Sequence, residues 1–142
     1  MRHNAEPPSP WPQLAAEYFE AEMSIARICL AALARAIATP EENLTDKMMD
    51  PPGKELVGVS SSIFRFFHYF DGAARNQLGC LSHTDIGLIT LIPVTNSPAL
   101  EILDEIDYRW RAYEKELKPG DMMVLCGETL ERLTAYYYPA VV

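Results

Sequence analysis

Residues 78–93 read LGCLSHTDIGLITLIP, and this stretch decides both the fold and the site that the sequence predicts. Its apolar second half, continuing to residue 94, is typical of a β-strand. Its first half places His83 and Asp85 two residues apart, and such residues point to the same face of a strand. An imidazole and a carboxylate at that spacing can bind one metal ion, with a third ligand from another strand. For His83 and Asp85 taken alone, a turn aspartate beside a surface histidine is the competing interpretation.

Short strands are predicted on both sides of this stretch. Turn-forming residues at 71–72, 96–98 and 118–121 separate runs of strand character. Many short strands with tight turns indicate a sandwich or a barrel. The predicted strands cover residues 62–70, 78–83, 88–94, 100–103, 110–113, 122–125 and 136–142, and a single helical turn is expected at 128–133.

Two helices are predicted before the strands, after a flexible, proline-rich lead-in at residues 1–10. From residue 11 apolar residues recur at helical spacing, so we expect one broad face of a long helix to be buried. A second helix is expected from residue 40 to about 49, with Thr39 as its cap and Glu42 completing a capping box. The face expected to be buried holds Trp11, Leu14, Tyr18, Ile25, Ile28, Ala32 and Ala36, widened by Phe19, Met23, Leu30 and Ile37.

Composition excludes several classes of partner. The chain has 142 residues and a formal charge of -8, which argues against nucleic acid and against an anionic membrane surface. Three cysteines, far apart and odd in number, argue against a disulfide framework and favour a reducing compartment. No signal-peptide pattern and no run long and apolar enough to span a bilayer is recognised. The expected location is the cytoplasm.

An ordered set of motifs extends the pattern around His83 over residues 12–142. The segments ALEILD at 99–104, YRWRAY at 108–113 and PGDMMVLCGETL at 119–130 follow the first stretch in order. Together with LGCLSHTDIGLITLIP and the two helices, they resemble the isopenicillin N synthase-like family of 2-oxoglutarate- and iron(II)-dependent oxygenases. Such an ordered set is more specific than any single motif.

The resemblance implies a fold, a cofactor and an activity. The implied fold class is α+β, an incomplete double-stranded β-helix (jelly roll) preceded by one long and one short helix. The implied domain covers residues 11–142, with helices at 11–50 and jelly-roll strands at 60–142. His83 and Asp85 correspond to iron(II) ligands, and Tyr69, in FHYF at 67–70, to the residue that binds the 2-oxoglutarate cosubstrate. The implied activity is oxidation of a small organic substrate, and no residue is assigned as a catalytic acid, base or nucleophile.

The sequence departs from the family pattern at its carboxyl end. The family's second ligand histidine and its cosubstrate-binding Arg-any-Ser follow the segment matched at 119–130, whereas no histidine follows His83 here. We therefore expect a fragment, with a partner chain covering the open jelly roll as one possibility. The alternative is a catalytically inactive truncated or diverged member that acts as a binding module. A hydrolase using another metal is a weaker alternative, because the sequence does not supply the three ligands and nearby general base that such sites use.

Overall fold

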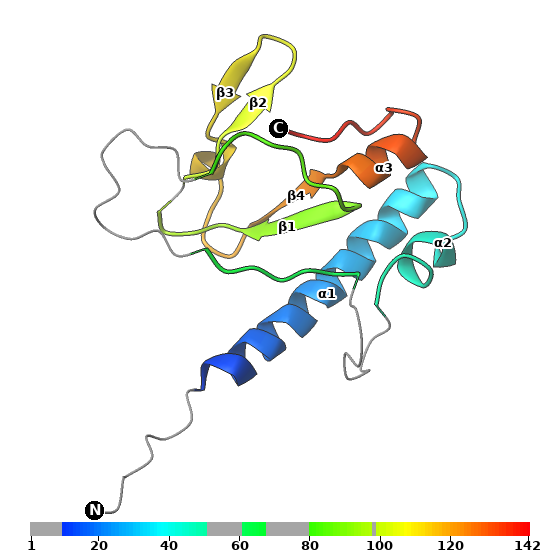
Figure 1. Ribbon diagram of the computed structural model, residues 1–142, viewed down its shortest axis with the longest axis horizontal. Helices are drawn as coiled ribbons and strands as arrows, with labels where there is room; N and C mark the ends of the chain where they lie inside the picture. Colours follow the sequence, from blue (N-terminus) through cyan, green and yellow to red (C-terminus); the bar gives the residue numbers. More distant parts are fainter. Residues whose placement is uncertain (1–9, 51–60, 68–79, 98) are drawn as a thin grey trace, which may run out of the picture. The chain divides into compact units, whose positions relative to one another are not determined.

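The computed structural model describes residues 10–50, 61–67, 80–97 and 99–142 of the chain, and within them the fold is α+β (Figure 1). The chain divides into two compact units, Met1–Phe66 and Phe67–Val142, which are described one at a time. Along the chain the elements are α1 (Trp11–Ala36), α2 (Glu42–Thr45), β1 (Ile89–Pro93), β2 (Ile102–Asp104), β3 (Arg109–Arg111), the 3₁₀-helix η1 (Tyr113–Glu116), β4 (Met122–Cys126) and α3 (Glu128–Leu133).

The first unit is built on α1, which starts at the predicted residue. Its buried residues are Ala26, Leu30, Ala31 and Ala34. The predicted apolar face is confirmed at Leu30, but the seven residues at its centre are exposed, Trp11 at 55% and Ile28 at 69%. None of the described helices is both long enough and apolar enough to cross a membrane.

The helix α2 contacts α1 and is shorter than predicted. The predicted cap is also wrong, because the Thr39 hydroxyl accepts a hydrogen bond from the Asn43 side chain (3.1 Å) and not from a backbone amide. Arg27 on α1 ties the end of α2 to the helix. Its guanidinium donates to the carbonyl oxygens of Thr45 (3.1 Å) and Asp50 and lies 3.8 Å from the Asp46 carboxylate.

Residues 61–66 follow in the same unit. Residues 62–67, the described part of the strand predicted at 62–70, do not form a strand. The Asp50 carboxylate accepts hydrogen bonds from the backbone amides of Ser61 (3.2 Å) and Ser62 (3.0 Å), so these amides are not available to a sheet. Phe64 packs against α1 instead, with ring centroids 5.8 Å from Tyr18 and 5.7 Å from Phe19. Aromatic packing therefore holds this segment where strand pairing was expected.

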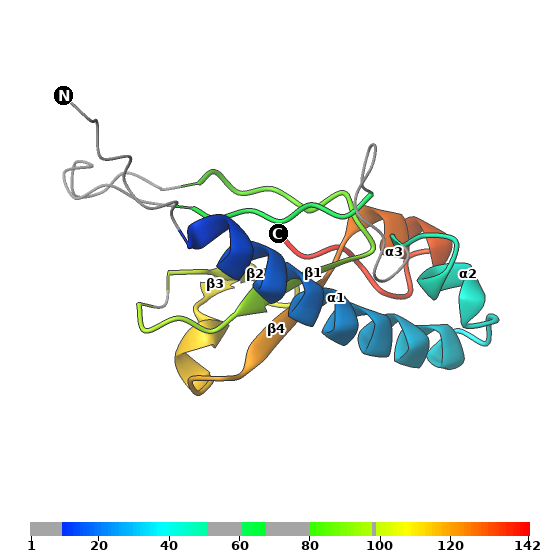
Figure 2. The same ribbon diagram turned by 90° about the horizontal axis from the view of Figure 1, so that it is seen from below.

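The second unit holds two antiparallel strand pairs. β1 pairs with β4 in the register Ile89 to Cys126 through Pro93 to Met122, and Figure 2 shows the two strands side by side. β2 pairs with β3, with Leu103 opposite Trp110. The strands predicted at 78–83 and 136–142 are not formed by the described residues there. The terminal residues nevertheless bridge both pairs, since the Val141 amide donates to Cys126 (3.2 Å) and the Leu103 amide to Val142 (2.8 Å).

A buried carboxylate organises the loop that leads from β1 to β2. Glu114 in η1 is only 4% exposed. One of its oxygens accepts from the amide and the hydroxyl of Thr95, both at 3.0 Å, and the other from the amides of Ala99 (3.0 Å) and Leu100 (3.4 Å). Burial opposes ionisation of Glu114, but these donors outweigh it and hold its pKa below the ordinary value.

Candidate functional site

The predicted metal-ligand pair lies in the loop that leads into β1, not in a strand of its own. Residues 80–88 have no regular secondary structure. The side chains of His83 and Asp85 are 60% and 37% exposed, so both can be reached from solvent. Tyr69, the predicted cosubstrate ligand, lies outside the described residues.

The two predicted ligands face each other. Nε2 of His83 lies 3.7 Å from Oδ1 of Asp85, which is too long for a hydrogen bond. Two donor atoms that each lie about 2.1 Å from one metal ion are separated by roughly 3.0–3.5 Å, depending on the coordination geometry. The pair therefore fits a shared ion after a shift of a few tenths of an ångström.

The ring orientation of His83 selects the atom that is free to bind. Nδ1 lies 2.8 Å from the carbonyl oxygen of Leu81, which can only accept a hydrogen bond. In the neutral imidazole the hydrogen therefore sits on Nδ1, and the lone pair is on Nε2, the atom that faces Asp85. Histidine ligands typically donate their second ring N–H to a carbonyl or carboxylate in this way.

Asp85 is oriented by an equivalent contact. The hydroxyl of Thr90, on β1, donates to Oδ2 of Asp85, which leaves Oδ1 directed toward His83. Each member of the pair thus has one atom held by a neighbour and one atom presented to the space between them. A surface histidine beside a turn aspartate, which is the competing interpretation, would not require this orientation.

Cys80 touches the opposite edge of the imidazole. Its Sγ lies 3.8 Å from Nδ1 of His83, whereas the aspartate lies on the Nε2 side, so these three side chains do not converge on one point. Across residues 10–50, 61–67, 80–97 and 99–142, no group of three histidine, cysteine, aspartate or glutamate side chains is arranged to hold a metal ion. Within these residues, the predicted metal site therefore has two candidate ligands.

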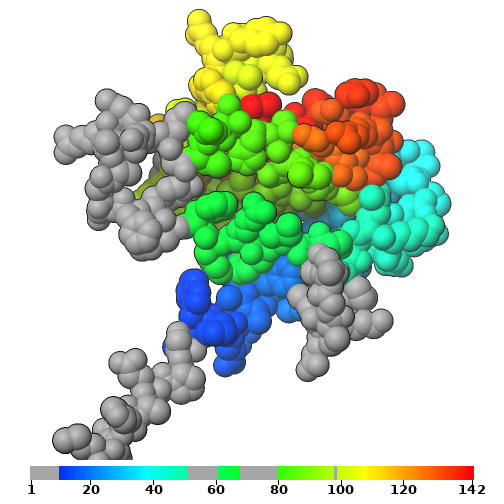
Figure 3. Space-filling view, viewed as in Figure 1, coloured from blue at the N-terminus to red at the C-terminus, as the bar shows by residue number. Residues whose placement is uncertain are grey.

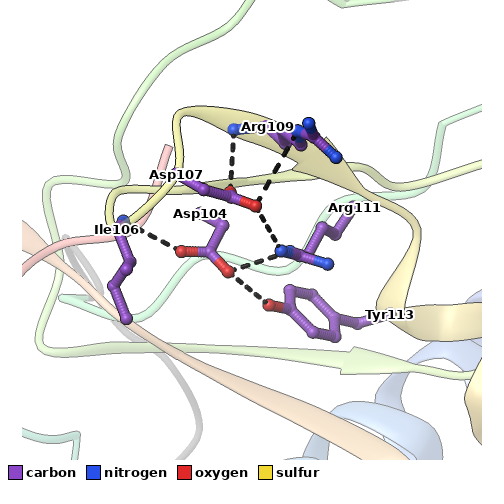
Figure 4. A network of polar contacts seen from close by, with 6 residues as sticks. All are labelled: Asp104, Ile106, Asp107, Arg109, Arg111 and Tyr113. Atoms are coloured by element: carbon purple, nitrogen blue, oxygen red, sulfur yellow. Dashed lines mark hydrogen bonds and ion pairs between the residues drawn. The ribbon is translucent and has the colours of Figure 1, made fainter.

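A second polar cluster braces the β2–β3 hairpin (Figure 4). Arg111 donates to Asp104 (2.8 Å) and to Asp107 (2.6 Å). The amide of Ile106, with the Arg111 side chain, holds the pKa of Asp104 below its ordinary value. Asp107, and then Asp104, raise the pKa of Arg111. Because the arginine and the two carboxylates satisfy one another, we assign this cluster to the hairpin turn and not to a binding site.

Sequence reasoning missed the residues that hold the predicted pair. No role is assigned to Thr84 from the sequence, but its hydroxyl donates to the Glu128 carboxylate at 2.6 Å. The contact of Thr90 with Asp85 spans five positions and follows from the turn at 86–88, which no spacing rule predicts. The only signal in the sequence is that Thr90, which carries a hydroxyl group, follows shortly after this turn.

Comparison of the chain with protein-family models, with curated proteins and with solved structures found no match.

Proposed function

We propose that His83 and Asp85 bind iron(II) in a 2-oxoglutarate-dependent oxygenase site that acts on a small organic substrate. The observation that carries the proposal is the orientation of the pair. Nδ1 of His83 is taken by Leu81 and Oδ2 of Asp85 by Thr90, while Nε2 and Oδ1 face each other at 3.7 Å. Both remaining atoms carry lone pairs, as metal ligands must.

The residues of this chain have distinct tasks in the proposed site. The neutral imidazole supplies a nitrogen ligand and the carboxylate supplies a charged oxygen ligand. When bound, iron(II) together with 2-oxoglutarate supplies the activation of dioxygen needed for oxidation of the substrate. Tyr69 is proposed to hydrogen-bond the cosubstrate, and solvent access to His83 and Asp85 leaves room for small molecules.

The proposal includes a finer fold. In it, the antiparallel pair β1–β4 belongs to a double-stranded β-helix. His83 and Asp85 lie in the irregular segment 80–88 that leads into β1, so the proposed site would stand at one end of this strand pair. Cys29, Cys80 and Cys126 are free thiols, which supports the proposed cytoplasmic location.

Anaerobic titration of the purified chain with iron(II), or with cobalt(II) as a spectroscopic substitute, tests the proposal. We expect saturation at one ion per chain and a loss of affinity of at least about tenfold in His83→Ala and in Asp85→Asn. Cys80→Ser is the matched control, because Cys80 contacts the other edge of the ring. It should bind like the wild type.

Two results would count against the metal site: binding that does not saturate, or binding that His83→Ala leaves unchanged. If metal binding saturates but no 2-oxoglutarate is consumed in a substrate screen, the proposed metal site would stand and the proposed oxygenase reaction would be contradicted. The remaining explanation would then be the binding-module alternative.

A further inference from the structure

We propose that residues 127–129, at the junction of β4 and α3, clamp the ligand loop 84–88 and thereby position Asp85. We call this segment the 127–129 clamp. The inference rests on the proposed metal site for its consequence, but the clamp itself is a contact within the unliganded protein. Figure 3 shows the green atoms of the ligand loop directly beside the orange atoms of α3.

The first argument is the pattern of backbone hydrogen bonds. Four consecutive carbonyl oxygens, from Asp85 to Leu88, accept hydrogen bonds from three consecutive clamp residues. The Gly127 amide donates to Leu88 (3.0 Å), the Glu128 amide to Asp85 (2.8 Å), and the Thr129 amide to Ile86 (3.2 Å) and Gly87 (3.1 Å). The hydroxyl of Thr129 adds a bond to Ile86 at 2.6 Å.

These bonds continue the β1–β4 ladder into a segment that is no longer a strand. The last paired residues are Ile89 and Cys126, and the next bond, from Gly127 to Leu88, lies directly beyond them. A loop at the end of a two-stranded ladder would otherwise fray. The clamp therefore gives the ligand loop an order that its own sequence does not supply.

The second argument is a side-chain tie between the two ligands. Thr84 lies between His83 and Asp85 in the chain, and its hydroxyl donates to Oε1 of Glu128 at 2.6 Å. Oε2 of Glu128 is held in turn by Arg132 at 3.0 Å. The clamp thus holds the backbone of Asp85 and the side chain of the preceding residue at the same time.

The third argument is the absence of space at Gly127. A Cβ atom there would lie 2.3 Å from the carbonyl oxygen of Gly87 and 2.9 Å from that of Asp85. The backbone angles of Gly127, φ −105° and ψ 170°, are open to any residue. Glycine is therefore required by the approach of the ligand loop and not by backbone conformation.

Gly127→Ala is the sharpest test, and Gly87→Ala is its matched control. A Cβ at Gly87 would meet only the Ile89 carbonyl oxygen at 3.8 Å, an ordinary contact. Loss of the contacts that orient metal ligands typically lowers the affinity for the metal by about 10–100-fold. We expect Gly127→Ala to lower cobalt(II) affinity within that range, and by clearly more than Gly87→Ala, which keeps the backbone carbonyl that accepts from Thr129.

Thr84→Val, with Thr84→Ser as rescue, keeps the test valid if Gly127→Ala does not fold. Valine removes the hydroxyl that donates a hydrogen bond to Glu128, and serine restores it. We expect about tenfold weaker cobalt(II) binding in Thr84→Val and recovery in Thr84→Ser. If the Thr84 hydroxyl had a merely structural role, Thr84→Val would alter the thermal stability. The cobalt(II) affinity would then not fall in Thr84→Val and recover in Thr84→Ser.

Amide hydrogen exchange in the metal-free protein separates the clamp from the metal site. The amides of Gly127, Glu128 and Thr129 should be protected in the wild type and should exchange faster in Thr84→Val. Unprotected amides, or metal binding unchanged in both Gly127→Ala and Thr84→Val, would overturn the clamp and leave the metal site standing. Protected amides in a chain that binds no metal would instead overturn the metal site.

Discussion

Replacement of Glu114 tests whether a single buried carboxylate holds the loop between β1 and β2. The structure gives it four accepted hydrogen bonds, two on each oxygen, from Thr95, Ala99 and Leu100. Glu114→Gln keeps the shape of the side chain but turns one oxygen into an NH₂ group. Whichever way the amide is oriented, a donor then faces a backbone N–H that needs an acceptor.

The expected magnitude follows from the number of bonds and from the exposure of the loop. A hydrogen bond to a charged group contributes about 1.5–3 kcal/mol net, so four independent bonds would give far more than a single substitution usually costs. Thr95 and Ala99 are exposed residues, however, and water can reach their freed donors. We therefore expect Glu114→Gln to lower the free energy of unfolding by about 2 kcal/mol and Glu114→Ala by about 3 kcal/mol.

Urea denaturation of variants in a Trp11→Phe background measures this loss. The remaining tryptophan, Trp110, then reports on the unit that contains Glu114. Glu116→Gln is the matched control, because Glu116 is an exposed glutamate of the same 3₁₀-helix. It should change the free energy of unfolding by less than about 0.5 kcal/mol.

The pH dependence supplies an independent check on the same carboxylate. The pKa of Glu114 is lower in the folded chain than its ordinary value of 4.5, so folding favours the ionised form. Its contribution is complete above pH 4.5 and is lost as the pH falls through the lower folded pKa. The difference in stability between wild type and Glu114→Gln should therefore be constant near neutral pH and shrink in acid. A difference no larger than that of Glu116→Gln, or one that grows in acid, would refute the reasoning.

Two further predictions concern the core and the proposed metal ligands. Leu130→Ala, at a fully buried side chain of α3, should lower the free energy of unfolding by about 3 kcal/mol, whereas Leu133→Ala, at a position 53% exposed, should cost less than about 1 kcal/mol; equal effects in urea denaturation would contradict this core assignment. Thr90→Val removes the donor to Asp85 and should weaken cobalt(II) binding about tenfold in an anaerobic titration, with recovery in Thr90→Ser. Binding equal to wild type in Thr90→Val would show that this hydroxyl does not orient the carboxylate.

The sequence predicted the elements whose signals are local. The start of α1 at Trp11, the strands β1 and β4, and the helical turn α3 all lie where the pattern placed them. Helical spacing and short apolar runs between turn residues are properties of neighbouring residues, and a single sequence contains them in full.

The sequence failed where a distant partner decides the outcome. The aromatic run after residue 61 has strong β-propensity. However, the amides of Ser61 and Ser62 donate to the Asp50 carboxylate, and the ring of Phe64 packs on α1. Propensity for strands mainly reflects fit to a neighbouring strand, which this segment does not have among the described residues. The prediction for the buried face of α1 is also wrong except at Leu30, since Ala26, Ala31 and Ala34 are buried while Trp11 and Ile28 are exposed.

The candidate site, too, could be predicted only in its local features. The spacing of His83 and Asp85 is visible in the sequence, and so is the chemistry of an imidazole beside a carboxylate. The contacts that select Nε2 and Oδ1 as the free atoms are not visible. They come from the carbonyl of Leu81 and the hydroxyl of Thr90, whose positions depend on how the loop turns into β1.

A metal-ligand pair must be accessible and yet fixed, and the arrangement around Asp85 reconciles the two requirements. His83 and Asp85 are more exposed than core residues, so neither is held by close packing. Their orientation rests on hydrogen bonds that leave the solvent side open: Leu81 and Thr90 hold the side chains, and Glu128 holds the backbone of Asp85. A surface used only for protein contacts needs no such selection of free atoms on a histidine and an aspartate. The orientation, more than the identity of the two residues, is therefore the reason to test this loop first as a metal site.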